Sequence, residues 1–242
     1  MVEASTSTQT VFQKMLLNVQ SGIWETGAKI PSERSLIDQF GVSRIAIREA
    51  LSMLRGLGVL EINHGQRTRV KTVDAVTLGH LLPLMLSSGG QQTFDQVFEV
   101  RLAIESQTAS QAARRRTSEQ LERLKELLAS FRDAMRNDGN TNAQAIDLEF
   151  HLEIARATAN PLFPVLLEAL AGFVSFAQKA SCQNDSERSQ RAVLAHESIF
   201  EAIRDADADR ARVEMESHLR YSMTRKIRPD EPLFDDSDPS AH

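Results

Sequence analysis

The chain has 242 residues, with 33 acidic and 28 basic side chains and a formal net charge of −5. Apolar residues make up 41% of it, which is enough for buried cores and excludes a wholly disordered protein. The single cysteine excludes a disulfide scaffold and a cysteine-cluster zinc site. No apolar run reaches the roughly 20 residues of a membrane-spanning helix, and no signal-peptide pattern opens the chain. With glycine and proline sparse, the composition predicts a cytoplasmic, mostly helical protein with no membrane partner.

Charge is distributed unevenly along the chain. Residues 1–71 carry nine basic and six acidic side chains, whereas the remainder carries 19 basic and 27 acidic ones. A basic head can direct a polyanion to one end, although a net charge of +3 is too small to decide this alone. Together with the elements below, this division predicts a first domain over 8–72, a helical domain over 74–228 and an acidic disordered tail over 229–242.

The first domain is predicted to contain three helices followed by a β-hairpin. Apolar residues at helical spacing from Phe12 predict a first helix that ends near Gly22. Ser32 is the expected cap of a second helix, and Ser43 is the expected cap of a third. Two short alternating segments around Gly65 predict the hairpin. This order is typical of a winged helix-turn-helix, whose third helix enters the DNA major groove.

The second domain is predicted to be entirely helical. Its expected helices cover residues 74–88, 93–115, 117–137, 141–158, 161–181, 187–205 and 207–227. The predicted fold class is therefore mainly α, with an N-terminal winged helix-turn-helix joined to a helical bundle of about seven helices.

Arginines lie at the start of the predicted recognition helix. Arg44 and Arg48 are four residues apart and share a face away from the apolar stripe. Arginine reaches guanine edges with a bidentate fork or clamps phosphates. Arg34 is placed to hold the backbone or a base edge, and Arg67 of the wing can lie along a groove. For each arginine alone, a solvated helix face or a charged strand edge is the structural alternative.

This domain resembles the DNA-binding domain of GntR-family bacterial regulators, and its wing is similar to the FadR branch. The matching segments are PSERSL at 31–36, FGVSR at 40–44, REAL at 48–51 and INHGQRTRV at 62–70. The resemblance implies that arginines of the two helices, with His64 and Gly65, contact operator DNA. The fatty-acid regulator of that branch has two threonines where this chain has Ile45 and Ala46, which predicts apolar contacts, for example to thymine methyl groups. The predicted DNA-contact residues are Arg34, Ser43, Arg44, Ile45, Ala46, Arg48, His64, Gly65 and Arg67.

Three histidines and one aspartate point towards the predicted helical core. Asp147 and His151 are four residues apart on one helix, while His196 and His218 lie on the apolar stripes of two others. Such a set suits a divalent transition metal of the zinc, nickel or manganese class. A core histidine satisfied by a backbone carbonyl is the alternative for each residue alone.

Arg101 occupies a helical position where an apolar residue is expected. A buried guanidinium needs an anion. Glu99, Glu105 or another internal acid is one candidate, and a bound carboxylate, which arginine grips bidentately, is the other.

The second domain resembles the FCD effector domain of FadR-type regulators. The matching positions are EVRLAIE at 99–105, then Asp147, Phe150, His151 and Asn160 of the first metal motif, and His196 and His218 of the later ones. The resemblance implies that the metal recruits a small organic acid whose carboxylate pairs with Arg101. The extra helix at 74–88 favours the seven-helix version of the domain, and the histidines argue against a fatty acyl-CoA effector.

The sequence therefore predicts a homodimeric repressor that reads an inverted-repeat operator and responds to a small carboxylate or sugar acid at a metal. A metal sensor without an organic effector is one alternative. A helical metalloenzyme fused to a DNA-binding head is another, but the chain contains no HExxH, P-loop or nucleophile-elbow motif. Glu153, the nearest candidate base, is two residues from His151 and is expected to face elsewhere.

Overall fold

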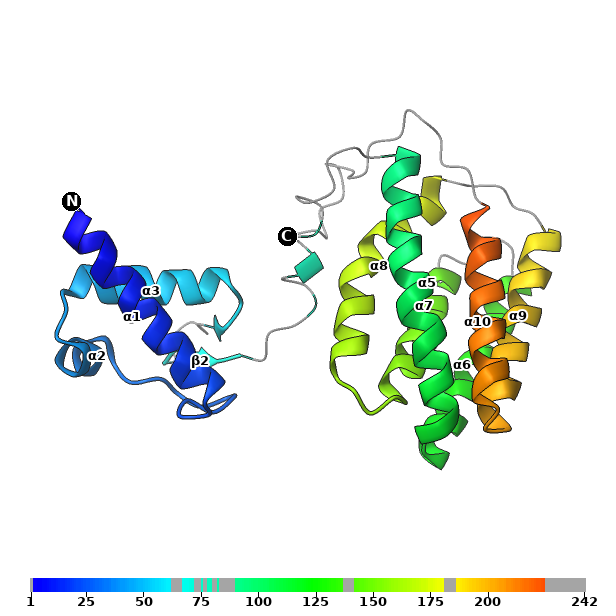
Figure 1. Cartoon of the computed structure of the whole chain (residues 1–242), viewed down its shortest axis with the longest axis horizontal. Helices are drawn as coiled ribbons and strands as arrows, with labels where there is room; N and C mark the ends of the chain where they lie inside the picture. The colour runs from blue at the N-terminus through cyan, green and yellow to red at the C-terminus, as the bar shows by residue number, and fades with distance from the viewer. Residues whose placement is uncertain are drawn as a thin grey trace. The chain divides into compact units, whose positions relative to one another are not determined.

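The computed structural model describes residues 2–61, 67–71, 75, 78–79, 82, 90–136, 142–180 and 186–224. The chain divides into two compact units, Met1–Thr77 and Leu78–His242 (Figure 1). Each unit has its own apolar core. The predicted tail over 229–242 lies outside the described residues. Among the described helices, none combines the length and the apolar character needed to cross a membrane.

The first unit confirms the predicted winged helix-turn-helix. Its elements are α1 (Val2–Gln20), α2 (Glu33–Phe40), α3 (Arg44–Gly56) and the antiparallel strands β1 (Leu60–Glu61) and β2 (Arg69–Val70). The Ser32 and Ser43 hydroxyls each accept a hydrogen bond of 3.2 Å from the backbone N–H three residues later, and so cap α2 and α3. Gly41 ends α2 with a φ of +65°, which a residue with a side chain rarely adopts. These local signals fix the angle at which α3 leaves the turn.

The connector between α1 and α2 extends the small sheet. The Gly27 N–H donates to the Val70 carbonyl at 2.8 Å, and the Ile30 N–H donates to the Thr68 carbonyl at 3.1 Å. Side chains of all these elements form one core with Met15, Leu36, Ile47 and Leu54 at its centre. Because α1 and α2 both pack on α3, the recognition helix is held by its buried face and its opposite face stays open.

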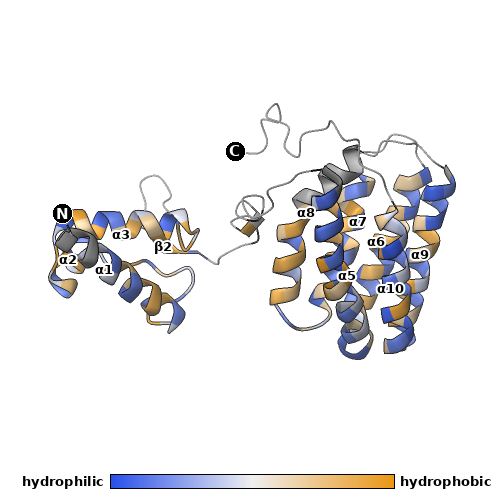
Figure 2. Cartoon of the chain, turned by 45° about the horizontal axis from the view of Figure 1, so that its top comes forward, coloured by the Kyte–Doolittle hydropathy of each residue, from blue (hydrophilic) through white to orange (hydrophobic). Residues whose placement is uncertain are grey.

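The second unit is a helical bundle, as predicted. Its described helices are α5 (Gly90–Arg115), α6 (Ser118–Arg136), α7 (Ala143–Arg156), α8 (Leu162–Ala180), α9 (Ser186–Arg204) and α10 (Ala208–Met223). Most of the helix predicted over 74–88 lies outside the described residues, although residues 75, 78, 79 and 82 are helical. Helix α5 is central and contacts α7, α8, α9 and α10. Figure 2 shows that the coloured part of α8 is largely apolar, whereas α9 and α10 carry polar residues on their outer faces.

Candidate metal centre and nucleic-acid interface

The bundle brings the four predicted ligands together. One ligand atom from each of Asp147, His151, His196 and His218 lies within 4.8 Å of the other three. The three imidazoles are buried, with exposures of 2%, 0% and 8% in chain order. The ring centroid of His218 is 5.3 Å from that of His151 and 4.7 Å from that of His196. A carboxylate and three imidazoles thus face one point inside the bundle.

Three helices supply these side chains. Asp147 and His151 are one turn apart on α7, so both project from the same face. His196 comes from α9 and His218 comes from α10. Phe131 and Phe150 pack against the His196 ring, with centroid distances of 4.5 and 4.7 Å. This aromatic contact limits the rotation of His196 and shields the cluster from water on that side.

The hydrogen bonds of His196 define which nitrogen faces the cluster. Its Nδ1 lies 2.8 Å from the Ala192 carbonyl, so in the neutral ring Nδ1 carries the proton. Nε2 then presents a lone pair towards Oδ1 of Asp147, 3.1 Å away. Two acceptors at that distance need either a cation between them or a second proton on the ring. The contact therefore marks a place for positive charge.

The pKa values of two cluster members are displaced in the direction that suits a metal. Burial by itself raises the pKa of Asp147, but the close contact with His196 and the charges of the surrounding histidines hold it well below its usual range. Burial, followed by the charges of His196 and His151, lowers the pKa of His218 well below 6.5. An ionised carboxylate and a neutral imidazole are the forms that bind a cation.

The residues present fit a divalent transition metal. Nε2 of His151 and Nε2 of His196 are buried, and neither has a hydrogen-bond partner among the described residues. A buried polar atom without a partner costs about 1–3 kcal/mol, so two such atoms beside a carboxylate call for a ligand. Three nitrogens and one oxygen are the donors that zinc-class metals accept, and four protein ligands leave octahedral positions open.

Arg101 is buried and its partner in the structure is an internal acid. Its Nε donates to Oε1 of Glu105, one helical turn later, at 2.5 Å. Its Cζ lies 4.9 Å from the centroid of the Phe98 ring, which supports the flat guanidinium. The contact with Glu105 is made by Nε. It does not involve the two terminal nitrogens, which can together donate two hydrogen bonds to a carboxylate. Of the acids considered as partners for Arg101, Glu105 is therefore the one that pairs with it.

Glu105 makes a contact that the sequence does not reveal. Its Oε2 lies against Nδ1 of His151, so the carboxylate joins α5 to α7 inside the core. The only sequence signal is the spacing of Glu105 one turn after Arg101, which predicts an ion pair and says nothing of α7. Glu153 is also buried, but it pairs with Arg156 at 3.2 Å and is not part of the ligand cluster.

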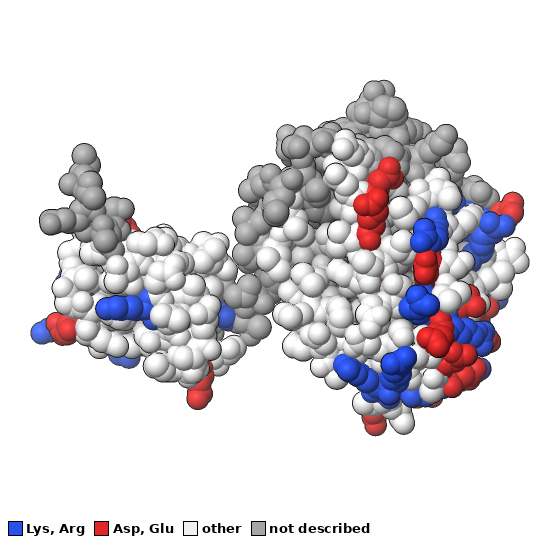
Figure 3. Space-filling model, in the orientation of Figure 1, with Lys and Arg blue, Asp and Glu red and all other residues white. Residues whose placement is uncertain are grey.

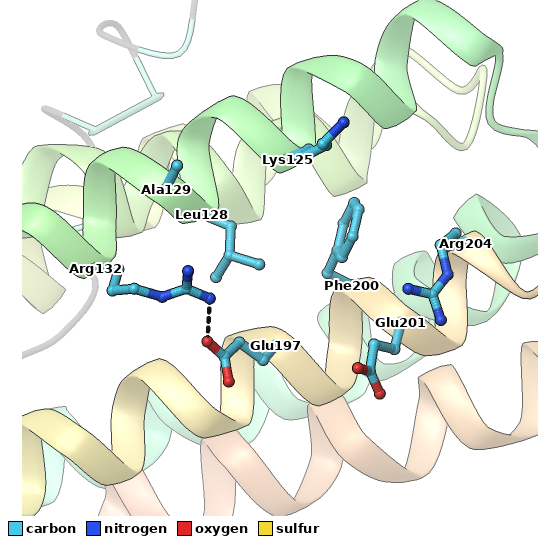
Figure 4. Close-up of a pocket in the computed structure, with 8 residues that line it drawn as sticks. All are labelled: Lys125, Leu128, Ala129, Arg132, Glu197, Phe200, Glu201 and Arg204. Atoms are coloured by element: carbon cyan, nitrogen blue, oxygen red, sulfur yellow. Dashed lines mark hydrogen bonds and ion pairs between the residues drawn. The ribbon is translucent and has the colours of Figure 1, made fainter.

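A hollow on the outside of the bundle lies between α6 and α9 (Figure 4). Leu128 and Phe200 supply apolar surface, and Arg132 pairs with Glu197 across it. No member of the ligand cluster lines this hollow. In Figure 3, acidic and basic side chains intermingle over the side of the bundle that carries α9 and α10. This mixed surface differs from the arginine-lined face of the first unit.

The predicted DNA-reading face of α3 is exposed. Arg34, Arg44 and Ile45 project into solvent, and Ile45 is 69% exposed although it is apolar. Arg48 donates from Nε to Oε2 of Glu33 at 2.9 Å, and both side chains are largely accessible. Glu33 is the first residue of α2, so this ion pair links the two helices of the helix-turn-helix on their outer side. Its presence on the DNA-reading face is not apparent from sequence spacing.

One predicted DNA contact needs correction, and two others lie outside the described residues. Ala46 is only 3% exposed, because it lies on the buried stripe of α3 with Ala50, so its methyl group is not available to a base. Ser43 is exposed, and its hydroxyl accepts the capping hydrogen bond from the Ala46 N–H. Arg67 is exposed at the start of the returning wing segment, whereas His64 and Gly65 lie outside the described residues.

Both units match known protein families. Residues 7–70 match the family described as bacterial regulatory proteins, gntR family, and residues 96–221 match the FCD domain. These are transcriptional regulators that bind operator DNA through the helix-turn-helix, and they are not enzymes. The metalloenzyme alternative is thereby removed.

Curated relatives and a solved structure agree with both matches. The chain is 32% identical over 208 residues to the HTH-type transcriptional repressor NanR of Klebsiella aerogenes, covering 84% of this chain and 78% of that protein. It is 34% identical over 201 residues to NanR of Cronobacter sakazakii, covering 80% and 75%. The structure titled Streptococcus agalactiae GntR superposes with a TM-score of 0.73 at 25% identity, covering 89% of this chain and 98% of that one. The chain therefore belongs to the GntR family of bacterial transcriptional regulators and carries an FCD domain as its second unit.

Proposed function

We propose that this protein is a homodimeric repressor whose operator affinity is controlled by a small organic acid bound at a divalent transition metal in the FCD domain. The observation that carries this proposal is the convergence of Asp147, His151, His196 and His218 inside the bundle, with two imidazole Nε2 atoms buried and unpaired. Each buried polar group without a hydrogen-bond partner lowers the stability of the fold, so this cluster does not contribute to stability by apolar packing.

In the metal-bound protein, the four side chains would be the ligands and the metal would supply a Lewis-acidic point for an oxygen of the effector. His196 is already oriented by the Ala192 carbonyl and by its two phenylalanine neighbours. The ionised form of Asp147 and the neutral form of His218 require no change of protonation before binding. The zinc, nickel and manganese class fits this donor set.

The effector class follows from Arg101 and the metal together. Arg101 is buried on α5 and linked to His151 through Glu105, so it lies near the ligand cluster. A ligand with a carboxylate for the guanidinium fork and a second oxygen for the metal satisfies both groups. Hydroxy acids, sugar acids and dicarboxylates have this chemistry. The proposed role of Arg101 is recognition of the effector carboxylate.

The first unit would read one half-site of the operator. We assign Arg34, Arg44, Ile45 and Arg48 to DNA contact through the exposed face of α3 and the start of α2, with Arg67, His64 and Gly65 in the wing. A dimer places two recognition helices on an inverted repeat and doubles the base contacts. An effector that prefers the DNA-free arrangement one hundredfold would provide about 2.7 kcal/mol of coupling.

A metal sensor without an organic effector is the second candidate. The observation in its favour is the ion pair between Arg101 and Glu105, because an internally neutralised arginine does not require an external anion. In this case metal binding alone would set the affinity for DNA.

One titration series separates these functions. Binding to an operator duplex, selected from a random pool with the metal-loaded protein, is measured first against added metal and then against organic acids at saturating metal. We expect stoichiometric metal in the natural protein, loss of that metal in His196→Ala with His218→Ala, and release of DNA by one class of acid. Metal content that survives the double substitution contradicts the ligand assignment. Release by metal alone, with no response to any acid, selects the metal sensor.

A further inference from the structure

Glu105 lies at the junction between the metal ligands and the arginine. It is 1% exposed on the central helix α5, and its two oxygens serve different partners. Oε1 accepts a hydrogen bond from Nε of Arg101, and Oε2 lies against Nδ1 of His151. A guanidinium, a carboxylate and an imidazole therefore form a continuous chain from α5 to α7.

The position of Glu105 bears on the tautomer of His151. One carboxylate oxygen accepts a hydrogen bond from Arg101, and the other lies against Nδ1 of His151. A carboxylate oxygen beside Nδ1 favours the tautomer that carries its proton on Nδ1.

The consequence for His151 lies at its other nitrogen. With the proton on Nδ1, the lone pair is on Nε2, which is buried and has no hydrogen-bond partner among the described residues. His196 has the same arrangement, with the Ala192 carbonyl in place of the carboxylate. Metal-binding histidines commonly donate their second ring N–H to such a partner, and loss of the partner weakens metal binding by about 10–100-fold.

We infer that Glu105 is a positioning residue that presents Nε2 of His151 to the metal and at the same time holds Arg101, so that metal binding and effector recognition share one carboxylate. This inference rests on the proposed function, since it concerns the same site. An ion pair that serves folding alone would affect the stability of the bundle and leave the metal affinity of the folded protein unchanged.

The first test measures metal affinity. Zinc affinity is determined by competition with a chromogenic chelator for the natural protein, for Glu105→Gln and for Glu99→Gln, and the cobalt(II) absorption spectrum reports the ligand set. Glu99 is an exposed carboxylate on the same helix and is the matched control. We expect zinc binding to weaken about 10–100-fold in Glu105→Gln and to stay unchanged in Glu99→Gln. Equal affinities in all three proteins overturn the inference.

The second test needs no substitution of Glu105. In the metal-free natural protein labelled with ¹⁵N-histidine, long-range NMR correlations identify the protonated nitrogen of each ring, and His151→Gln assigns its signals. We expect His151 to carry its proton on Nδ1. A proton on Nε2 overturns the inference even if Glu105→Gln does not fold.

The third test concerns the shared carboxylate. If Arg101 acts on the metal through Glu105, Arg101→Met changes zinc affinity in the natural background and has no further effect in Glu105→Gln. An equal effect in both backgrounds overturns the shared role. Absence of stoichiometric zinc from the natural protein contradicts the proposed function, whereas normal zinc with an indifferent Glu105 contradicts this inference alone.

Discussion

The ion pair between Glu33 and Arg48 is expected to oppose the binding of α3 to DNA. Nε of Arg48 lies 2.9 Å from Oε2 of Glu33, and the two side chains are 61% and 42% exposed. In the proposed complex, Arg48 turns from Glu33 to a base edge or a phosphate, so the ion pair must break. In Glu33→Gln there is no ion pair to break, and a negative charge that repels phosphates is also removed. We therefore expect tighter operator binding.

The magnitude follows from the exposure of the pair. Accessible ion pairs contribute about 0.2–1 kcal/mol, because water and salt screen them. Breaking this one therefore opposes binding by that amount, and its removal should raise operator affinity by about 1.4–5-fold. Glu33 also lies in the first turn of α2, so its loss should lower the stability of the first unit by about 0.3–1 kcal/mol. Affinity and stability are thus expected to change in opposite directions.

Fluorescence anisotropy with the selected operator duplex measures the affinity, and thermal unfolding measures the stability. Asp38→Asn is the matched control, since it removes an exposed acid from the same helix. In the Arg48→Ala background, Glu33→Gln should have a smaller effect than in the natural protein. If Glu33→Gln weakens operator binding as strongly as Arg48→Ala does, then Glu33 orients Arg48 for DNA and the reasoning is refuted.

Four further predictions concern other parts of the molecule. Arg44→Ala should cost about 1–3 kcal/mol of operator binding, and an unchanged dissociation constant would remove this residue from the recognition face. Arg101→Ala should leave operator binding intact without effector and blunt the release by an organic acid, so a normal release curve would leave Arg101 as a core ion-pair residue. The folded-state pKa of Glu105, about 2, lies below its ordinary value of 4.5, so its stabilisation of the metal-free protein should be complete above pH 4.5 and be lost as the pH falls towards 2. The stabilisation lost between these pH values is on the order of 3 kcal/mol. Urea unfolding at several pH values measures the free energy of unfolding, which should depend less on pH in Glu105→Gln than in the natural protein. Ala159 has a φ of +57° after α7, so Ala159→Gly should stabilise the protein by about 0.5–1 kcal/mol, with a lower melting temperature as the contrary result.

Local signals account for most of the first unit. Ser32 and Ser43 cap the two helices of the helix-turn-helix because a hydroxyl three residues before an unpaired N–H satisfies it, whatever the rest of the chain does. Gly41 ends α2 for an equally local reason. In α3 the sequence-based prediction is wrong at Ala46. Ala46 follows the exposed Ile45 and precedes the core residue Ile47, so small differences in helix rotation decide whether it faces DNA or the core.

In the second unit, periodicity along one helix was enough to pair Asp147 with His151, because side chains one turn apart share a face. The inward direction of His196 and His218 also follows from the apolar stripes around them. The identity of the partners across helices does not, since it depends on how the helices rotate and cross when they pack. The contact of Glu105 with His151 joins residues 46 positions apart, and no spacing rule connects them. The amino-acid order alone thus predicts which residues turn inward, and the packing of α5 against α7 determines which of them touch.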